Sequence, residues 1–170
     1  MSTAAPVDSV ILVHGGFVDG SGWQTVYNIL TKDGYSVRVA QHPTVSLAGD
    51  VAATRQLVGS SLARSSSSAI HAAAPGRVMA DSQVPWGQDA LAGTVSQAAW
   101  RAKQSWYLET TEDRMISPQA QRAMAQRAGS TVTEVAASHS VFLSQPAVVA
   151  DLIRQATAGS GSGRPLARVR

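Results

Sequence analysis

The stretch SVILVHGGFVDGSGW, residues 9–23, decides the fold of this chain. Its first five residues, Ser9–Val13, are β-branched and almost continuously apolar, which predicts a strand buried on both faces of a parallel sheet. A turn-rich segment follows over residues 14–22. Apolar residues then recur at helical spacing from 23 to 30, and Gly34 is placed to close that helix at C′.

The strand–helix alternation continues beyond this opening. Residues 36–40 are typical of a second strand, and Ser46 is placed to cap a helix that runs to about residue 58. The second half repeats the pattern: a strand over 105–110, a helix from Pro118 to just before Gly129, a strand over 131–135, and a helix from Pro146. This order predicts an α/β fold with a mostly parallel sheet flanked by helices.

The middle of the chain departs from this regularity. Residues 59–77, GSSLARSSSSAIHAAAPGR, contain no acidic residue and are mostly Ser and Ala, so they have little helical or strand periodicity. Residues 78–103 regain a helical pattern around 88–95. We therefore expect one α/β domain over residues 1–157, with an aberrant junction at 59–77 and a remnant of a lid or helical region at 78–103. Residues 158–170 are expected to form a disordered tail.

Composition excludes several classes of function. The 170 residues include no cysteine, which rules out disulfides and thiolate chemistry. The net charge of +3 comes from three arginines in the tail, at positions 164, 168 and 170, so no nucleic-acid surface is expected. No apolar run is long enough for a membrane helix, and the first residues do not resemble a secretion signal. These observations predict a cytoplasmic protein that binds neither nucleic acid nor membrane.

Three short motifs suggest chemistry. His14–Phe17 (HGGF) directly follows the first strand, and glycines there let backbone N–H groups approach a ligand, as an oxyanion hole requires. Asp113 and His139 each follow a predicted strand, 26 residues apart. One helix and one strand fit into that interval, so we expect both side chains at the carboxyl edge of the sheet. Taken singly, each motif also fits an ordinary turn, a capping acid or a loop histidine.

Together the motifs resemble a known family. Residues 10–23, VILVHGGFVDGSGW, resemble the N-terminal signature of small α/β-hydrolases, in the branch of plant methylesterases, hydroxynitrile lyases and their bacterial relatives. Residues 105–153, which contain SWYLETTEDRMISP and VAASHSVFLSQP, resemble the C-terminal part of that branch. The resemblance implies that Asp113 is the acid and His139 the base of a catalytic triad. It also implies that Gly16 offers an oxyanion-hole amide and that Phe17 lines the pocket.

The nucleophile of that family is not where the pattern requires it. A G-x-S-x-G elbow needs a strand before it and a helix after it, and a βαβ unit takes about 30 residues or more. Only the 19 residues 59–77 occupy this place, so the chain resembles a family member with a central deletion. Residues 57–63, LVGSSLA, mimic an elbow with Ser61 in the nucleophile position, but no apolar strand precedes them.

Several alternatives stay open. The family activity is hydrolysis of small carboxylic esters by serine, histidine and aspartate, which needs no cofactor. The deletion favours instead an inactive remnant or a small-molecule binding module, and lyases share the same triad. A metal site is not expected, since the chain's four histidines show no H-x₃-H or H-E-x-x-H spacing. Loss of a central strand would also expose sheet edges, through which the chain would self-associate.

Overall fold

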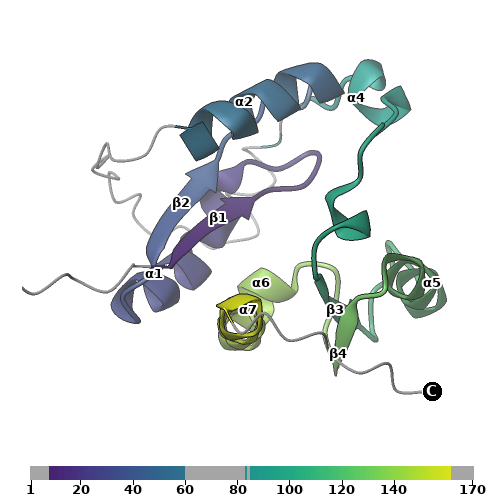
Figure 1. The fold of residues 1–170 in the computed structure, drawn as a ribbon. Helices are drawn as coiled ribbons and strands as arrows, with labels where there is room; N and C mark the ends of the chain where they lie inside the picture. Colours follow the sequence, from purple (N-terminus) through teal and green to yellow (C-terminus); the bar gives the residue numbers. More distant parts are fainter. Residues whose placement is uncertain (1–7, 60–82, 84, 162–170) are drawn as a thin grey trace, which may run out of the picture. The chain divides into compact units, whose positions relative to one another are not determined.

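The structure is a computed structural model that describes residues 8–59, 83 and 85–161. The chain divides into two compact units, with the boundary between Ser96 and Gln97. Figure 1 shows the helices and strands of both, and each unit is described by itself below.

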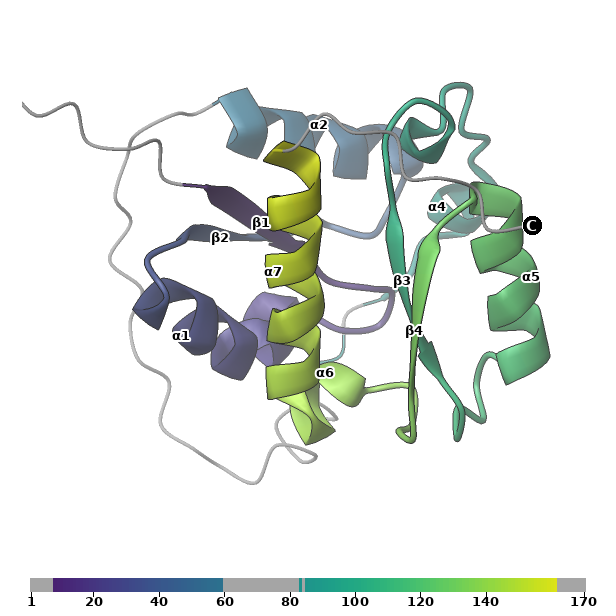
Figure 2. The same cartoon turned by 60° about the horizontal axis from the view of Figure 1, so that its bottom comes forward.

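The first unit is built on a parallel pair of strands, β1 (Ser9–Val13) and β2 (Ser36–Ala40), joined in register from Ser9↔Ser36 to Val13↔Ala40. Two helices, α1 (Gln24–Lys32) and α2 (Leu47–Gly59), lie on opposite sides of this pair (Figures 1 and 2). Its core consists of buried apolar residues from β1, α1 and β2, namely Leu12, Val26, Leu30 and Ala40.

Local sequence explains where these helices begin and end. Gly34 adopts a φ of 90° just after the C-cap of α1, a left-handed conformation that suits glycine at C′. The Ser46 hydroxyl accepts the N–H of Gly49, which satisfies one of the free donors at the start of α2. A 3₁₀ turn, η1 (Gly20–Trp23), precedes α1 and is capped by Asp19, whose carboxylate accepts the N–H of Ser21.

The second unit repeats the design with β3 (Trp106–Thr110) and β4 (Thr131–Val135), again parallel, with Trp106 opposite Thr131. In the chain, α5 (Pro118–Ala128) connects these strands. It is capped by the Ser117 hydroxyl and ends at Gly129, which has a φ of 64°. A short helix, α6 (Val141–Ser144), leads into α7 (Pro146–Gly161). In both views α5 and α7 lie on opposite sides of the strand pair (Figures 1 and 2).

The α/β architecture expected from the sequence is confirmed, but three local expectations were wrong. β1 is not buried on both faces: Leu12 is buried, whereas Val13, the last residue of the strand, is 45% exposed and lines a cavity. The helix expected around 88–95 is shorter, α4 (Gln88–Ala92), and ends where Gly93 turns extended. The last helix continues to Gly161, beyond the expected start of the tail at 158.

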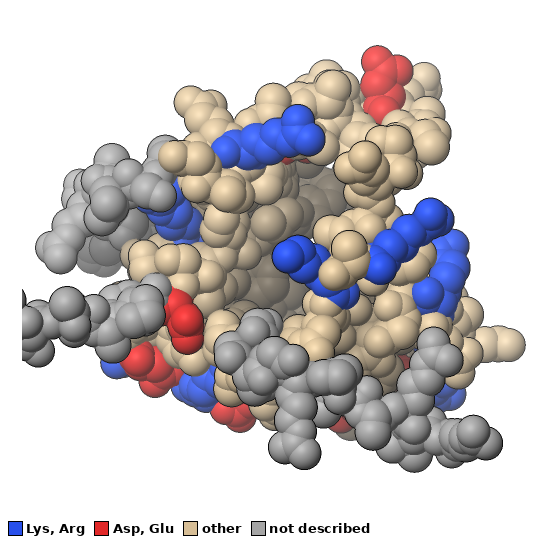
Figure 3. Space-filling view, in the orientation of Figure 1, with Lys and Arg blue, Asp and Glu red and all other residues tan. Residues whose placement is uncertain are grey.

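The remaining described element is a 3₁₀ turn, η2 (Ala99–Arg101). No helix among the described residues is long and apolar enough to cross a bilayer. Uncharged side chains make up most of the face drawn in Figure 3, in keeping with a chain in which only 15% of residues are charged.

Candidate active site

Asp113 lies three residues after β3 ends, in a turn whose other residues are exposed, and is itself only 7% exposed. Its Oδ1 accepts backbone N–H groups from Met115 at 2.8 Å and from Ile116 at 3.0 Å. These two bonds use the chain's own turn to hold one oxygen of the carboxylate. The second oxygen, Oδ2, is thereby directed away from the turn.

Oδ2 of Asp113 lies 2.9 Å from Nδ1 of His139. The parallel register explains why they meet: Thr110 pairs with Val135, so the chain leaves β3 and β4 at the same edge. Two further bonds extend this pairing, from Thr111 N to Val135 O and from Glu112 N to Ala137 O. The 26-residue spacing thus brings the acid and the histidine together, as the sequence predicted.

The His139 ring has one engaged and one available nitrogen. With Asp113 ionised, Nδ1 carries the proton that Oδ2 accepts, and Nε2 of a neutral imidazole is then an acceptor. The side chain is 42% exposed, and within the described part of the chain Nε2 has no hydrogen-bond partner. A group in this state can take a proton from a nearby hydroxyl.

Asp113 is held ionised by its surroundings. Burial raises the pKa of its carboxyl, but hydrogen bonds from His139 and from the backbone N–H groups of Ile116 and Met115 outweigh burial and lower it. The pKa of the neighbouring Tyr107 hydroxyl shifts in the opposite direction, because burial and then the negative charges of Asp113 and Glu109 raise it. Asp113 therefore remains an anion, which is the form that orients a histidine.

Two buried residues that sequence reasoning missed also contact this carboxylate. Gln121 of α5 is 3% exposed and donates from Nε2 to Asp113 Oδ2 at 3.1 Å. Thr110, the last residue of β3, donates from its hydroxyl to the same oxygen at 3.3 Å. The only sequence signal was the position of Gln121 four residues before Ala125, on the face of α5 that is buried.

The HGGF turn belongs to the first unit. Phe17 has a φ of 64°, a left-handed conformation that costs an aromatic residue about 1–3 kcal/mol and that is enriched at active and ligand-binding sites. Within the described residues, the backbone N–H groups of Gly16 and Phe17 donate to no acceptor. These are the free donors that an oxyanion hole requires.

Trp86 packs directly on this turn. A Cβ built on Gly16 would lie 2.6 Å from the Trp86 ring, so only glycine allows so close an approach. The Phe17 and Trp86 rings meet edge to face with centroids 5.1 Å apart. Beside them is a cavity of about 620 Å³, within the range of small-molecule sites, whose lining includes His14, Gly16 and Trp86.

A histidine pair also lines this cavity. The rings of His14 and His42 are 4.5 Å apart, and His14 Nε2 accepts the backbone N–H of His42. Burial and then the nearby His14 lower the pKa of His42, against the opposing charge of Asp50. Of the chain's other two histidines, His71 lies outside the described residues and His139 is described with the second unit.

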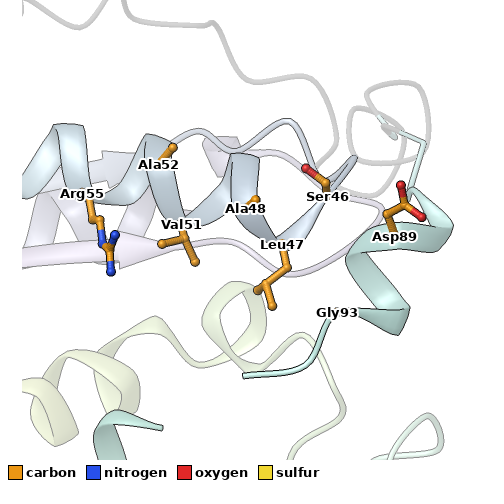
Figure 4. A pocket seen from close by; sticks show the side chains of 8 residues that line it. All are labelled: Ser46, Leu47, Ala48, Val51, Ala52, Arg55, Asp89 and Gly93. Carbon is orange, nitrogen blue, oxygen red and sulfur yellow. The ribbon is translucent and has the colours of Figure 1, made fainter. Parts of the chain in front are cut away.

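A second hollow of about 630 Å³ lies along α2, and Figure 4 shows its lining. Its walls are mostly apolar, with Arg55 and Asp89 as the charged groups. The lining residues are Ser46, Leu47, Ala48, Val51, Ala52, Arg55, Asp89 and Gly93. Among the described residues, no group of three or more His, Cys, Asp or Glu side chains is arranged to hold a metal ion.

The predicted site residues thus fall into three sets. Asp113 and His139 are hydrogen-bonded in the second unit, and Gly16 and Phe17 form a turn in the first. Ser61, the predicted nucleophile, lies outside the described residues.

Comparison with known proteins identifies the class. Residues 38–152, more than half of the chain, match the family model described as alpha/beta hydrolase family. Crystal structures of PytH, described as a novel pyrethroid hydrolase, share the fold: three of them superpose with TM-scores of 0.67–0.70, at 13–14% identity, covering 94% of this chain and 100% of theirs. Among curated proteins, none matches the chain significantly. The chain belongs to the alpha/beta hydrolase family.

Proposed function

We propose that this protein hydrolyses small carboxylic esters by acyl transfer, with His139 as the general base and Asp113 as the residue that orients it. The observation that carries the proposal is the 2.9 Å bond from His139 Nδ1 to a buried carboxylate that is itself held by two backbone N–H groups. This is the arrangement by which an acid fixes the tautomer of a catalytic histidine.

The proposed reaction follows from the two nitrogens of His139. A serine hydroxyl attacks the ester carbonyl while Nε2 takes its proton, and the resulting imidazolium returns that proton to the departing alcohol. Water then attacks the acyl-serine with the same base, which releases the acid and restores the serine. The N–H of Gly16 is proposed to bind the oxyanion, with Phe17 lining the pocket.

The nucleophile proposed for this reaction is Ser61. Its flanking sequence, GSSLA at 59–63, differs from G-x-S-x-G only in the last position, where alanine is also small. We further propose that the chain derives from the methylesterase-like branch and lacks the central strand that normally precedes the elbow. The short interval between the end of α2 at Gly59 and residue 77 supports this view.

Labelling with a fluorophosphonate tests the proposal. The purified chain, shown to be folded by circular dichroism, is expected to gain one covalent adduct by intact mass, mapped by peptide sequencing to Ser61. The adduct should be lost in His139→Ala and Ser61→Ala but retained in Ser60→Ala, the matched neighbouring serine. A folded wild-type chain that takes up no adduct contradicts the hydrolase proposal.

One observation favours a second candidate, a binding module of the same fold without catalysis. In the described part of the chain, no serine hydroxyl is hydrogen-bonded to His139. The cavity of about 620 Å³ is lined by residues of the first unit. On this alternative, a short-chain ester would shift the NMR signals of Trp86 and His42 and would be recovered unhydrolysed. Release of the acid during that titration would exclude it.

A further inference from the structure

The amide of Gln121 makes more hydrogen bonds than any other side chain around the candidate site. Nε2 donates to Ile116 O at 2.9 Å and to Asp113 Oδ2 at 3.1 Å. Nε2 also lies 3.1 Å from Thr110 Oγ1 and 3.3 Å from Thr110 O. Oε1 accepts the N–H of Thr110 at 3.1 Å. A buried amide with both ends engaged has one well-defined orientation.

The donors and acceptors around the amide fix that orientation. The Thr110 N–H can only donate, so the atom of Gln121 that faces it must be the oxygen. The Ile116 carbonyl can only accept, so the atom that faces it must be the nitrogen. The amide therefore cannot flip, and the group presented to Asp113 is always an N–H donor.

A fixed donor on Oδ2 restricts the hydrogen-bonded pair of Asp113 and His139, here called the dyad. Asp113 Oδ1 is held by two backbone N–H groups, and Gln121 occupies one side of Oδ2. The carboxylate cannot rotate without losing charge-assisted bonds at both oxygens. The rest of Oδ2 faces the Thr110 hydroxyl, at 3.3 Å, and His139, which can bind it only by donating from Nδ1.

The neighbouring residue on α5 shows that Gln121 is not needed simply to attach this helix to β3. Arg122 lies 2.9 Å from Glu109, a carboxylate that is 1% exposed, and so already ties α5 to β3. Gln121 contacts the next residue of the strand, Thr110, and continues beyond it to the carboxylate of the dyad. Its additional bond therefore serves Asp113.

We infer that Gln121 is a positioning residue of this site: its amide locks the Asp113 carboxylate and thereby holds His139 in the tautomer with the proton on Nδ1. The inference rests on the proposed function for its catalytic meaning. Which nitrogen of the His139 ring carries the proton can be measured without any catalytic turnover.

The test is the state of the His139 ring in Gln121→Met, a variant of similar volume that loses both donor and acceptor. In protein labelled with ¹⁵N-histidine, NMR reports which ring nitrogen is protonated and how fast the Nδ1 proton exchanges with water. His139→Ala identifies the signal. The matched control is Gln126→Met, which changes an exposed glutamine on the same helix.

The wild-type chain and Gln126→Met are expected to keep the proton on Nδ1. In Gln121→Met the Nδ1 proton should exchange about tenfold faster or more, because a charge-assisted bond that fixes its acceptor is lost. A folded Gln121→Met with wild-type exchange and tautomer would overturn the inference. Fluorophosphonate labelling of the wild-type chain, run in parallel, reports on the proposed function separately.

A second variant keeps the inference testable if Gln121→Met does not fold. Gln121→Glu retains an oxygen for the Thr110 N–H, but it can donate to Asp113 only when protonated. Two carboxyl groups that share a proton titrate with one pKa strongly raised. Protection of the His139 proton should therefore fall more steeply with rising pH in Gln121→Glu than in the wild-type chain. Identical pH profiles would also overturn the inference.

Discussion

Asparagine at position 113 is the substitution whose effect follows most directly from the geometry. Oδ1 of Asp113 accepts two backbone N–H groups, from Met115 and Ile116. The oxygen of an asparagine must remain there, because its NH₂ group would place a donor against two donors. In Asp113→Asn the NH₂ group therefore stands where Oδ2 now accepts from His139 and Gln121.

The histidine must respond to this change. A donor facing Nδ1 favours the tautomer in which Nδ1 accepts and the proton moves to Nε2. The nitrogen that should take a proton from the nucleophile then already carries one. In an acid–histidine–serine triad the wrong tautomer lowers kcat by about 10⁴-fold, and we expect a loss of this size in the rate of fluorophosphonate labelling or ester hydrolysis.

Stability should fall as well. Asp113→Asn removes charge-assisted hydrogen bonds and leaves the Gln121 N–H without its acceptor, each worth about 1–3 kcal/mol. We expect the free energy of unfolding to drop by about 3 kcal/mol in urea titrations. The control is Asp151→Asn, an exposed aspartate of α7 paired with Arg154, for which a change within about 0.5 kcal/mol is expected.

The same substitution should change how stability depends on pH. The pKa of Asp113 is lowered in the folded chain. Its contribution is therefore complete above the unfolded value of about 3.9 and is lost as pH falls through the folded value. Urea midpoints measured from about pH 6 downward should fall less steeply in Asp113→Asn than in the wild-type chain. The reasoning is refuted if Nε2 of His139 stays unprotonated in this variant, or if its stability matches that of Asp151→Asn.

Two further predictions concern single contacts. Arg122→Met leaves the buried Glu109 carboxylate without its ion-pair partner and should lower the free energy of unfolding by about 3 kcal/mol. Adding Glu109→Gln should recover part of this loss in urea titrations. A double variant no more stable than Arg122→Met contradicts the assignment of Arg122 as the partner of Glu109. Gly16→Ala places a Cβ 2.6 Å from the Trp86 ring and should cost about 1–3 kcal/mol with a change in tryptophan fluorescence. Gly15→Ala is the matched control, since among the described residues no atom beyond its chain neighbours lies within 4 Å of its added Cβ. An equal effect at both positions would disprove the packing argument.

Local structure could be predicted from the sequence because its determinants are local. The Pro118 and Gly129 pair gave the limits of α5, and the β-branched run Ser9–Val13 gave β1, since proline, glycine and β-branched side chains restrict their own backbone. The meeting of Asp113 with His139 was also predictable. It follows from chain order and from the rule that parallel strands end at one edge of a sheet.

Other features depend on which side chains meet, and no spacing rule predicts that. The position of Gln121 on α5 is an ordinary one for a glutamine, and its role near Asp113 emerges only when the helix packs on β3. The His14–His42 pair has the same origin, because the two residues lie 28 positions apart and meet only through the pairing of β1 with β2.

By itself the sequence determined the α/β class, the order of strands and helices, and the two residues of the acid–histidine pair, because backbone preferences and apolar periodicity act over a few residues. Only the tertiary structure decided how much of β1 is buried, how the Asp113 carboxylate is held, and which buried polar groups surround it. Burial and hydrogen bonding between elements depend on distances and directions in space, which a linear pattern of residues does not contain.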